Sequence, residues 1–249
     1  MSSLRIAVVG TPRSGNTWVR YVLGDALDLQ QMMPVHNPRD IAPELPERAA
    51  LQIHWYREPN FQAFLRTNGF RVVVVARHPL DVLISALHFR RREWSLVRWL
   101  EGNAEFPPDF AEYAPASPSF VAYATSWGAE NLLSVSYQWW HDRDAIRVRY
   151  EQLVREPVAA FTSLVEQLNE PADRVAKAIE ANPFKAMQDL PNKHGWRGTP
   201  GLWRQLIPPL DAWRIFRRHR RVFDTLGYGI PPYLLTRRAA LRNWQRLAI

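Results

Sequence analysis

Near the N-terminus, a short loop has residue types and spacing that suit the binding of an anion. Gly10 and Gly15 enclose four residues, the spacing of a phosphate-binding loop, and an apolar run precedes Gly10. Glycine adopts backbone conformations that other residues resist, so the loop amides can point at one place beside the positive N-terminus of the following helix. The loop therefore predicts a phosphate or sulfate group as its ligand.

The loop differs from that of an NTP-binding protein at the position that reaches the β- and γ-phosphates. Asn16 stands where such a loop has lysine, and only the next residue, Thr17, fits the pattern. The cation lies inside the loop instead, at Arg13, where it can neutralise a phosphate oxygen or stabilise charge on a leaving group. This argues against an ordinary ATPase or kinase, although a glycine-rich turn that binds nothing can have the same spacing.

Two more candidate residues follow strand-like runs. Arg77 comes directly after the β-branched run 70–76, where an NTPase usually has a Mg²⁺-binding aspartate, so this position indicates an anion rather than a metal. His54 ends the short run 51–54, in which apolar and polar residues alternate. Ligands of open parallel sheets bind at the carboxyl ends of the strands, which is where both side chains are expected.

Apolar patterning predicts an α/β fold, with a parallel sheet flanked by helices in three layers. We expect strands at 5–10, 51–54, 70–76 and 145–150. The expected helices cover 17–29, 59–67, 79–92, 94–101, 120–141, 157–168, 171–181 and the arginine-rich stretch 214–221. The proline-containing segments 30–46 and 102–119 are expected to be irregular, the first as a surface loop and the second as a lid over a pocket.

Composition limits the function further. The 249 residues have no linker-like stretch and are 47% hydrophobic, so we expect one globular domain over 1–249. Without an apolar run of membrane-spanning length or a leader-like start, a soluble, cytoplasmic protein is expected. The absence of cysteine excludes disulfides and thiolate chemistry, and the net charge of +8 favours an anionic ligand: a nucleotide cofactor, an acidic acceptor or nucleic acid.

Two motifs resemble those of the sulfotransferases that use 3′-phosphoadenosine 5′-phosphosulfate (PAPS). Residues 11–18, Thr-Pro-Arg-Ser-Gly-Asn-Thr-Trp, resemble the 5′-phosphosulfate loop of that family. Residues 77–89 resemble its 3′-phosphate motif, RNPKDVxVSxxHF, with the same spacing from Arg77 to Ser85. The resemblance implies a sulfotransferase fold like that of P-loop nucleoside-triphosphate hydrolases, PAPS as co-substrate, and no metal.

The resemblance also implies roles for single residues. His54 matches the general base of the family, and Arg13 matches the loop cation that assists catalysis. Tyr150 with Glu151, 182–187 and 197–204 resemble further segments of the nucleotide site. The residues implied to bind the cofactor are Arg13, Ser14, Gly15, Asn16, Thr17, Trp18, Arg77, Ser85, Tyr150, Asn182, Phe184, Arg197 and Gly198.

Some positions depart from the family pattern. Arg13 and Gln52 stand where cytosolic members have lysine, Trp196 replaces an arginine, and the dimerisation pattern expected over 204–213 is absent. The expected acceptor is a hydroxyl of a small molecule or carbohydrate, with no membrane span and no nucleic-acid partner. Two alternatives remain: a nucleotide kinase or NTPase with an atypical loop, and a nucleic-acid-binding protein that uses the arginines of 214–221. A solvated helix face is the favoured explanation of those arginines.

Overall fold

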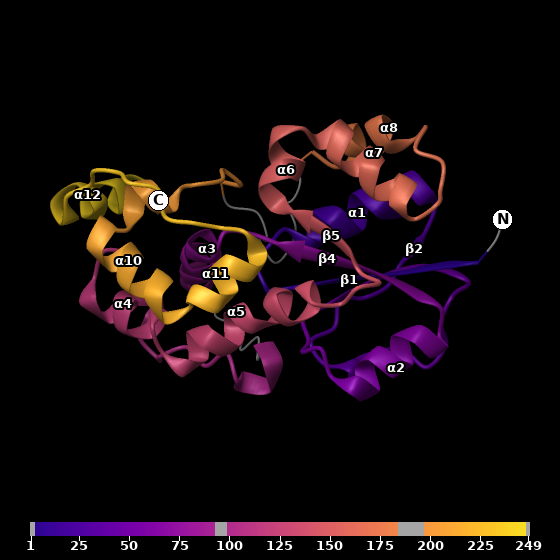
Figure 1. Cartoon of the computed structure of the whole chain (residues 1–249), viewed down its shortest axis with the longest axis horizontal. Helices are drawn as coiled ribbons and strands as arrows, with labels where there is room; N and C mark the ends of the chain where they lie inside the picture. Colours follow the sequence, from indigo (N-terminus) through magenta and orange to yellow (C-terminus); the bar gives the residue numbers. More distant parts are fainter. Residues whose placement is uncertain (1–2, 93–98, 184–196, 248–249) are drawn as a thin grey trace.

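The computed structural model describes residues 3–92, 99–183 and 197–247, and its centre is a sheet of five parallel strands (Figure 1). Their order is β2-β3-β1-β4-β5. In the register of the central strands, Val9 of β1 lies beside Ile53 of β3 and Val74 of β4. The strands are β1 Leu4–Gly10, β2 Gln30–Gln31, β3 Arg48–Ile53, β4 Phe70–Ala76 and β5 Ile146–Arg149. The predicted α/β class with a parallel sheet is confirmed.

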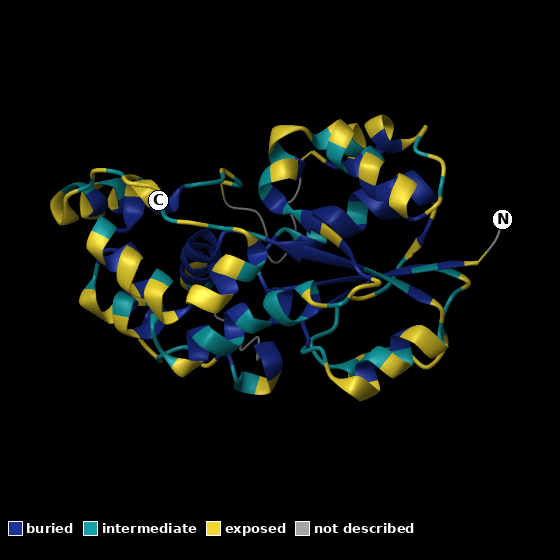
Figure 2. Ribbon diagram, in the orientation of Figure 1, coloured by how far each residue is buried: buried dark blue, intermediate teal, exposed yellow. Residues whose placement is uncertain are grey.

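Helices cover both faces of the sheet, because the central strands are apolar on both sides. Ile6 and Val8 of β1 pack with α1, α6, α7 and α8, whereas Ala7 and Val9 pack with α2, α3 and α5 on the other face. Figure 2 shows the buried residues concentrated along the sheet and on the inner sides of these helices. The helices that form the two layers are α1 Asn16–Leu27, α2 Pro59–Thr67, α3 Pro79–Arg92, α5 Trp127–Trp140, α6 Tyr150–Arg155, α7 Pro157–Gln167 and α8 Val175–Ala181.

Two helices predicted as continuous are each interrupted. The helix expected at 120–141 is in fact α4 Pro118–Ala124 followed by α5, because Ser126 caps α5 by accepting a hydrogen bond from the amide of Ala129. The arginine-rich helix is divided at His219 into α10 Pro209–Arg218 and α11 Arg220–Leu226. The buried His219 ring donates from Nε2 to the carbonyl oxygen of Ala124 at 2.8 Å, so a tertiary contact stabilises this break.

The segments expected to be irregular contain local structure. Residues 30–46 include β2 and a 3₁₀ turn at Pro38–Asp40, and 102–119 includes a 3₁₀ turn at Phe110–Glu112. Most of 102–119 is irregular, as expected, but the segment is packed against the core: Phe110 is fully buried and its ring stacks on Phe106, with 4.8 Å between ring centres. Of the helix expected at 94–101, residues 93–98 lie outside the described part, and Trp99–Gly102 forms a 3₁₀ turn.

The last helices gather at the end of the molecule opposite α2 and the N-terminus (Figure 1). They are α9 Trp203–Leu206, α10, α11 and α12 Arg237–Leu247. Among the described residues, none of the helices combines the length and apolar character that crossing a bilayer requires.

Candidate active site

The strand order places the candidate residues side by side at the carboxyl edge of the sheet. The anion loop, Thr11–Gly15, follows β1, while His54 follows β3 and Arg77 follows β4. Because β1 lies between β3 and β4, the loop is flanked by His54 on one side and by Arg77 on the other. The sheet therefore brings together three groups that are far apart in the sequence.

The backbone of the anion loop takes a tight, partly left-handed course. Arg13 has a φ of 71° and Gly15 a φ of 96°. A Cβ atom at Gly15 would lie 2.5 Å from the Tyr150 ring, so both the backbone conformation and the contact require glycine. The loop then leads directly into α1, whose N-terminal amides and positive dipole end lie next to it.

Hydrogen bonds hold the loop to a distant helix. The amide of Thr11 donates to Ser136 Oγ at 2.7 Å, the amide of Ser136 donates to Thr11 Oγ1 at 3.1 Å, and Ser136 Oγ donates to Val75 O at 2.7 Å. Asn16, which replaces the lysine of an NTP-binding loop, donates from Nδ2 to Thr11 O at 2.9 Å. Ser136 was not identified from the sequence, because it lies mid-helix without a motif around it.

Arg13, Arg77 and Ser85 form one cluster, as their motifs imply. Arg13 Nε donates to Ser85 Oγ at 3.2 Å, and Arg77 donates from Nη1 to the carbonyl oxygen of Arg13 at 3.1 Å. The Arg13 guanidinium lies 4.8 Å from the centre of the Phe89 ring. Burial and the charge of Arg77 lower the pKa of Arg13 to about 10, so Arg13 is still cationic at neutral pH. Two like charges this close favour a bound anion.

Several polar atoms in and beside the anion loop are buried and form no hydrogen bond with a described residue. They are Ser14 Oγ, Arg77 Nε and Asn16 Oδ1. A buried donor that bonds to nothing costs about 1–3 kcal/mol, and an anion accepting from Ser14 and Arg77 would remove that cost. The cluster thus fits a phosphate-bearing ligand by the chemistry of its own donors.

The residues that the family resemblance implies to contact the adenine lie on the α1 and α8 side of the anion loop. Trp18 donates from Nε1 to Asn182 O at 3.0 Å, and Asn182 donates from Nδ2 to Asp25 Oδ2 at 2.6 Å. Trp18 is only 6% exposed, so most of its surface packs in the core. Thr17 is half-buried in the first turn of α1, and Phe184 lies outside the described residues.

Tyr150 connects the loop to the last motif. Its ring lies under the Arg77 guanidinium, 4.6 Å from ring centre to the guanidinium carbon, and its hydroxyl donates to Gly198 O at 2.7 Å. Burial raises the pKa of Tyr150 to about 12, so the hydroxyl stays protonated. Arg197, adjacent to Gly198, is exposed. Tyr150 thereby places the 197–198 backbone next to Arg77.

A buried carboxylate holds the rest of that motif. Asp81, in the first turn of α3, accepts hydrogen bonds from the amides of Gly201 at 2.6 Å and Trp203 at 3.0 Å. Burial raises the pKa of Asp81. The sequence assigned Asp81 only to the positive end of its helix, because a contact across 120 residues has no local signal.

On the β3 side, hydrogen bonds determine which nitrogen of His54 can accept a proton. His54 Nδ1 lies 2.8 Å from the carbonyl oxygen of Gly10, which can only accept, so Nδ1 carries the hydrogen. His54 Nε2 therefore carries the lone pair, with which it accepts a hydrogen bond from Gln52 Nε2 at 3.3 Å. The His54 ring also stacks on His36, with 5.5 Å between ring centres. His36 was missed, because it lies in the segment 30–46 that was expected to be an irregular surface loop.

His88 lies close to the arginines but is held neutral. Burial, reinforced by the charges of Arg92 and Arg13, lowers the pKa of His88 to about 3. A neutral imidazole can accept or donate a hydrogen bond without adding to the positive charge of the cluster. The sequence placed His88 within the 3′-phosphate motif and gave it no role.

A second buried histidine makes the folded protein sensitive to acid. His78 accepts from the Leu80 amide at Nδ1 and donates from Nε2 to Gly229 O at 3.2 Å, with its ring stacked on Trp203. Burial lowers the pKa of His78 from 6.5 to about 4. The folded state therefore binds the proton more weakly than the unfolded chain, and stability present above pH 6.5 is lost as the pH falls towards 4.

We expect His78 to cost the wild-type protein about 2–3 kcal/mol of unfolding free energy between about pH 7 and pH 4.5. Urea unfolding of wild type and His78→Asn at both pH values measures this. Asparagine does not titrate, so the variant should lose less stability than the wild type over the same interval. An equal loss in both proteins would contradict the assignment.

The described residues contain no group of three or more histidine, aspartate or glutamate side chains arranged to hold a metal ion.

Comparisons with known proteins agree with this geometry. A family model described as "Sulfotransferase domain" matches residues 4–197. A search of curated proteins finds no match.

Among solved structures, the mouse sulfotransferase SULT7A1 complexed with PAP is similar at a TM-score of 0.67 and 16% identity, covering 88% of this chain and 84% of that one. Retinol dehydratase in complex with androsterone and the inactive cofactor PAP is similar at a TM-score of 0.53 and 17% identity, covering 94% and 83%. At these identities the likeness concerns the fold, whereas the family model covers most of the sequence. The chain belongs to the sulfotransferase domain family.

Proposed function

We propose that the protein transfers a sulfuryl group from PAPS to a hydroxyl of a small-molecule or carbohydrate acceptor and releases adenosine 3′,5′-bisphosphate. The observation that carries this proposal is the cluster of Arg13, Arg77 and Ser85 at the anion loop, where Ser14 Oγ and Arg77 Nε are buried and form no hydrogen bond with a described residue. A nucleotide with phosphates on the 3′ and 5′ oxygens of its ribose offers acceptors for such donors. Family membership supports the same reaction.

The proposed cofactor contacts follow from where the side chains lie. The loop amides of 13–16 with the Thr17 hydroxyl would hold the 5′-phosphate at the start of α1. Arg77 and Ser85, with Arg197 and Gly198, would hold the 3′-phosphate. The adenine would lie near Tyr150, and Trp18, Asn182 and Phe184 would be its other contacts.

The proposed chemistry divides between the two sides of the loop. When bound, PAPS supplies an activated sulfuryl group. His54 Nε2 takes the proton of the acceptor hydroxyl, while Nδ1–H stays bonded to Gly10 O and keeps the ring in orientation. Arg13 stabilises the negative charge that develops on the departing phosphate oxygen. The Arg13 guanidinium provides, at the transferred group, positive charge that a phosphoryl-transfer site takes largely from Mg²⁺.

The first test needs no acceptor. Adenosine 3′,5′-bisphosphate at about 100 times its Kd should stabilise the folded protein by about 2.7 kcal/mol, which is roughly 5–10 °C in Tm for a chain of this size. ATP with Mg²⁺ at the same concentration should shift the Tm less. Stabilisation by ATP with Mg²⁺ alone would refute the proposal and favour the kinase or NTPase alternative.

Arg77→Ala is expected to weaken binding of the bisphosphate by about 10- to 100-fold, because it removes a charged donor from the 3′-phosphate. Titration calorimetry of wild type and variant measures the change. Arg66→Ala is the matched control, since Arg66 is exposed on α2 away from the carboxyl edge of the sheet. Unchanged affinity in Arg77→Ala would remove Arg77 from the site.

A further inference from the structure

The C-terminal helices carry most of the net charge of the protein. Residues 209–247 contain nine arginines, two aspartates and no lysine or glutamate, a net charge of +7 in a chain of +8. Both aspartates are engaged: Asp211 pairs with Arg237 at 2.6 Å and with Arg214 at 3.7 Å, and Asp224 pairs with Arg220 at 3.2 Å. Arg218 pairs with Glu130 of α5 at 2.5 Å, and no arginine of this stretch other than those named forms an ion pair with a described residue. This stretch lies outside the residues that the family model matches.

Large apolar side chains are exposed among these arginines. Leu234 is 100% exposed, Leu210 76% and Trp213 50%, and Leu241 on α12 is exposed as well. Four of the seven large exposed apolar side chains of the described residues thus fall within 209–247. Single exposed leucines are ordinary, but their concentration on the most basic part of the chain indicates a surface that is covered in use.

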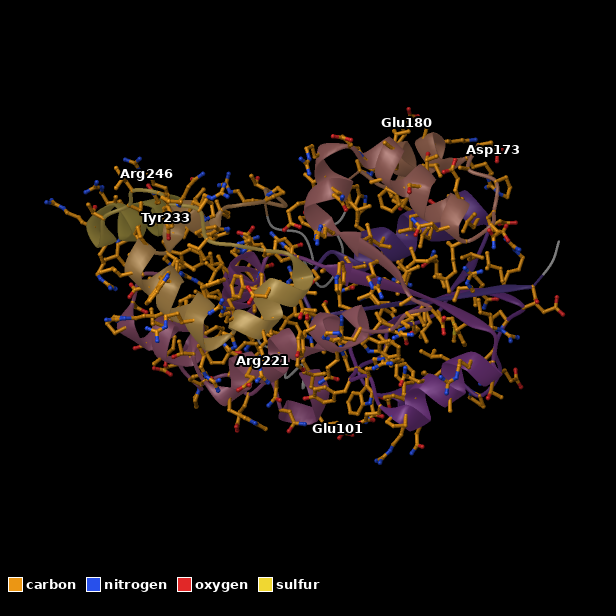
Figure 3. All side chains as sticks on the ribbon, in the orientation of Figure 1. Glu101, Asp173, Glu180, Arg221, Tyr233 and Arg246 are labelled. Atoms are coloured by element: carbon orange, nitrogen blue, oxygen red, sulfur yellow. The ribbon has the colours of Figure 1, made fainter. Side chains whose placement is uncertain are left out.

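Tertiary contacts bring part of this set to one corner. The Tyr233 hydroxyl donates to Ile207 O at 2.5 Å, and Arg237 pairs with Asp211. These contacts hold the 231–235 loop and the start of α12 against the start of α10, so Leu234 lies at the same corner as Leu210. Figure 3 shows Tyr233 and Arg246 at this end of the molecule, with Asp173 and Glu180 at the other end.

The outer faces of the two helices continue the pattern. On α10, Trp213 and Arg217 lie on one face, with the guanidinium 4.8 Å from the indole ring centre. On α12, Arg238, Arg242 and Arg246 repeat every four residues, which places them in a row about 6 Å apart along the exposed face. The other face of α12 buries Ala240 and Trp244. None of the three α12 arginines forms an ion pair with a described residue.

We propose that this part of the protein docks on the surface of a membrane that contains anionic phospholipids. The docking face, here called the arginine–leucine surface, comprises Leu210, Trp213, Arg217, Leu234, Arg238, Leu241, Arg242 and Arg246. The guanidinium groups pair with lipid phosphates, and the leucines and Trp213 enter the boundary between headgroups and acyl chains. A nucleic acid would satisfy the arginines but would offer no apolar phase to Leu234. The combination of charge and exposed leucine therefore favours a membrane over a soluble polyanion.

Docking there would make the protein peripheral and would bring it to acceptors that reside in the membrane. The proposal does not depend on the transferred group, because the arginine–leucine surface uses none of the residues assigned to the cofactor.

Sedimentation with sucrose-loaded vesicles tests the proposal on the full-length protein. At about 0.1 M salt, where the Debye length is about 10 Å, the wild type should sediment with phosphatidylcholine vesicles that contain one third phosphatidylglycerol but not with phosphatidylcholine alone. Arg238→Gln/Arg242→Gln/Arg246→Gln should lower the partition coefficient by about 100-fold. Leu234→Ser should lower it by about tenfold, because the leucine no longer inserts.

The matched control is Arg66→Gln/Arg155→Gln/Arg174→Gln, which removes the same charge from exposed positions on α2, on α6 and before α8. This variant should keep at least a third of the wild-type partition coefficient. Absence of sedimentation with anionic vesicles would overturn the proposal. An equal loss in both triple variants would also overturn it. So would unchanged vesicle binding of Leu234→Ser together with wild-type binding to single-stranded RNA that is tighter than binding to the anionic vesicles, which would indicate a purely electrostatic surface.

Discussion

Replacing Arg13 by glutamine is expected to lower the rate of sulfuryl transfer by about 10²- to 10³-fold, the usual effect of removing one donor that stabilises transition-state charge. Arg13 lies inside the anion loop, bonded to Ser85 and packed over Phe89, so its charge is oriented before the reaction begins. No other described cation belongs to this loop. Glutamine keeps polarity and similar length while removing the charge.

Release of adenosine 3′,5′-bisphosphate from PAPS, with the acceptor that screening identifies, measures this effect. Arg13→Lys should retain most of the rate, because it keeps the charge and because cytosolic members of the family have lysine at this position of the loop. It should lose some, since lysine lacks the planar fork that reaches Ser85 while staying over Phe89. Arg66→Gln should behave as wild type. A near-wild-type rate in Arg13→Gln would refute the catalytic role.

Replacing His54 by alanine is expected to lower the rate by about 10²- to 10⁴-fold, because the acceptor hydroxyl loses its general base. The affinity for adenosine 3′,5′-bisphosphate should stay within about threefold of wild type, since His54 lies on the β3 side of the loop and Arg77 on the β4 side. The loss should therefore appear in kcat rather than in cofactor binding. That separation distinguishes a catalytic histidine from a structural one.

Two controls accompany His54→Ala. His141→Ala removes an exposed histidine at the end of α5 and should leave the rate unchanged. His54→Asn can keep a donor to Gly10 O but cannot take the proton, so it should be about as slow as His54→Ala. A wild-type rate in His54→Asn would contradict the role of His54 as general base. The ring would then only pack in the site and hydrogen-bond Gly10 O.

The sequence predicted the parts of this site that depend on neighbouring residues. The strand over 70–76 follows from a β-branched run, and the anion loop from two glycines and a cation within six residues. Because parallel strands end at the same edge, the meeting of the loop with Arg77 and His54 could also be anticipated. The base assignment of His54 came from family resemblance rather than from its surroundings.

What the sequence missed depends on long-range contacts. Ser136 holds Thr11 across 125 residues, and nothing around Ser136 distinguishes it from another polar residue of α5. The break at His219 arises from its bond to Ala124, whereas the local pattern favoured a continuous helix. Phe110 lies in a proline-containing stretch that is irregular by composition, yet the ring is completely buried. In each case tertiary packing decides a conformation that local propensity leaves open.

The bond between Thr11 and Ser136 also affects the order in which the protein takes shape during synthesis. A ribosome adds about 5–20 residues per second, so Ser136 follows Thr11 by roughly 6 to 25 seconds. In roughly the second half of that interval the chain already contains β1, β3 and β4, whose residues lie before position 77, and these strands can pair. Until Ser136 is synthesised, the anion loop lacks its hydrogen bonds to α5. The edge of β4 stays unpaired until β5 at 146–149 is available. An unpaired edge of this kind recruits other strands, so the emerging chain is exposed to aggregation until its second half arrives, and chaperone binding is expected in that interval.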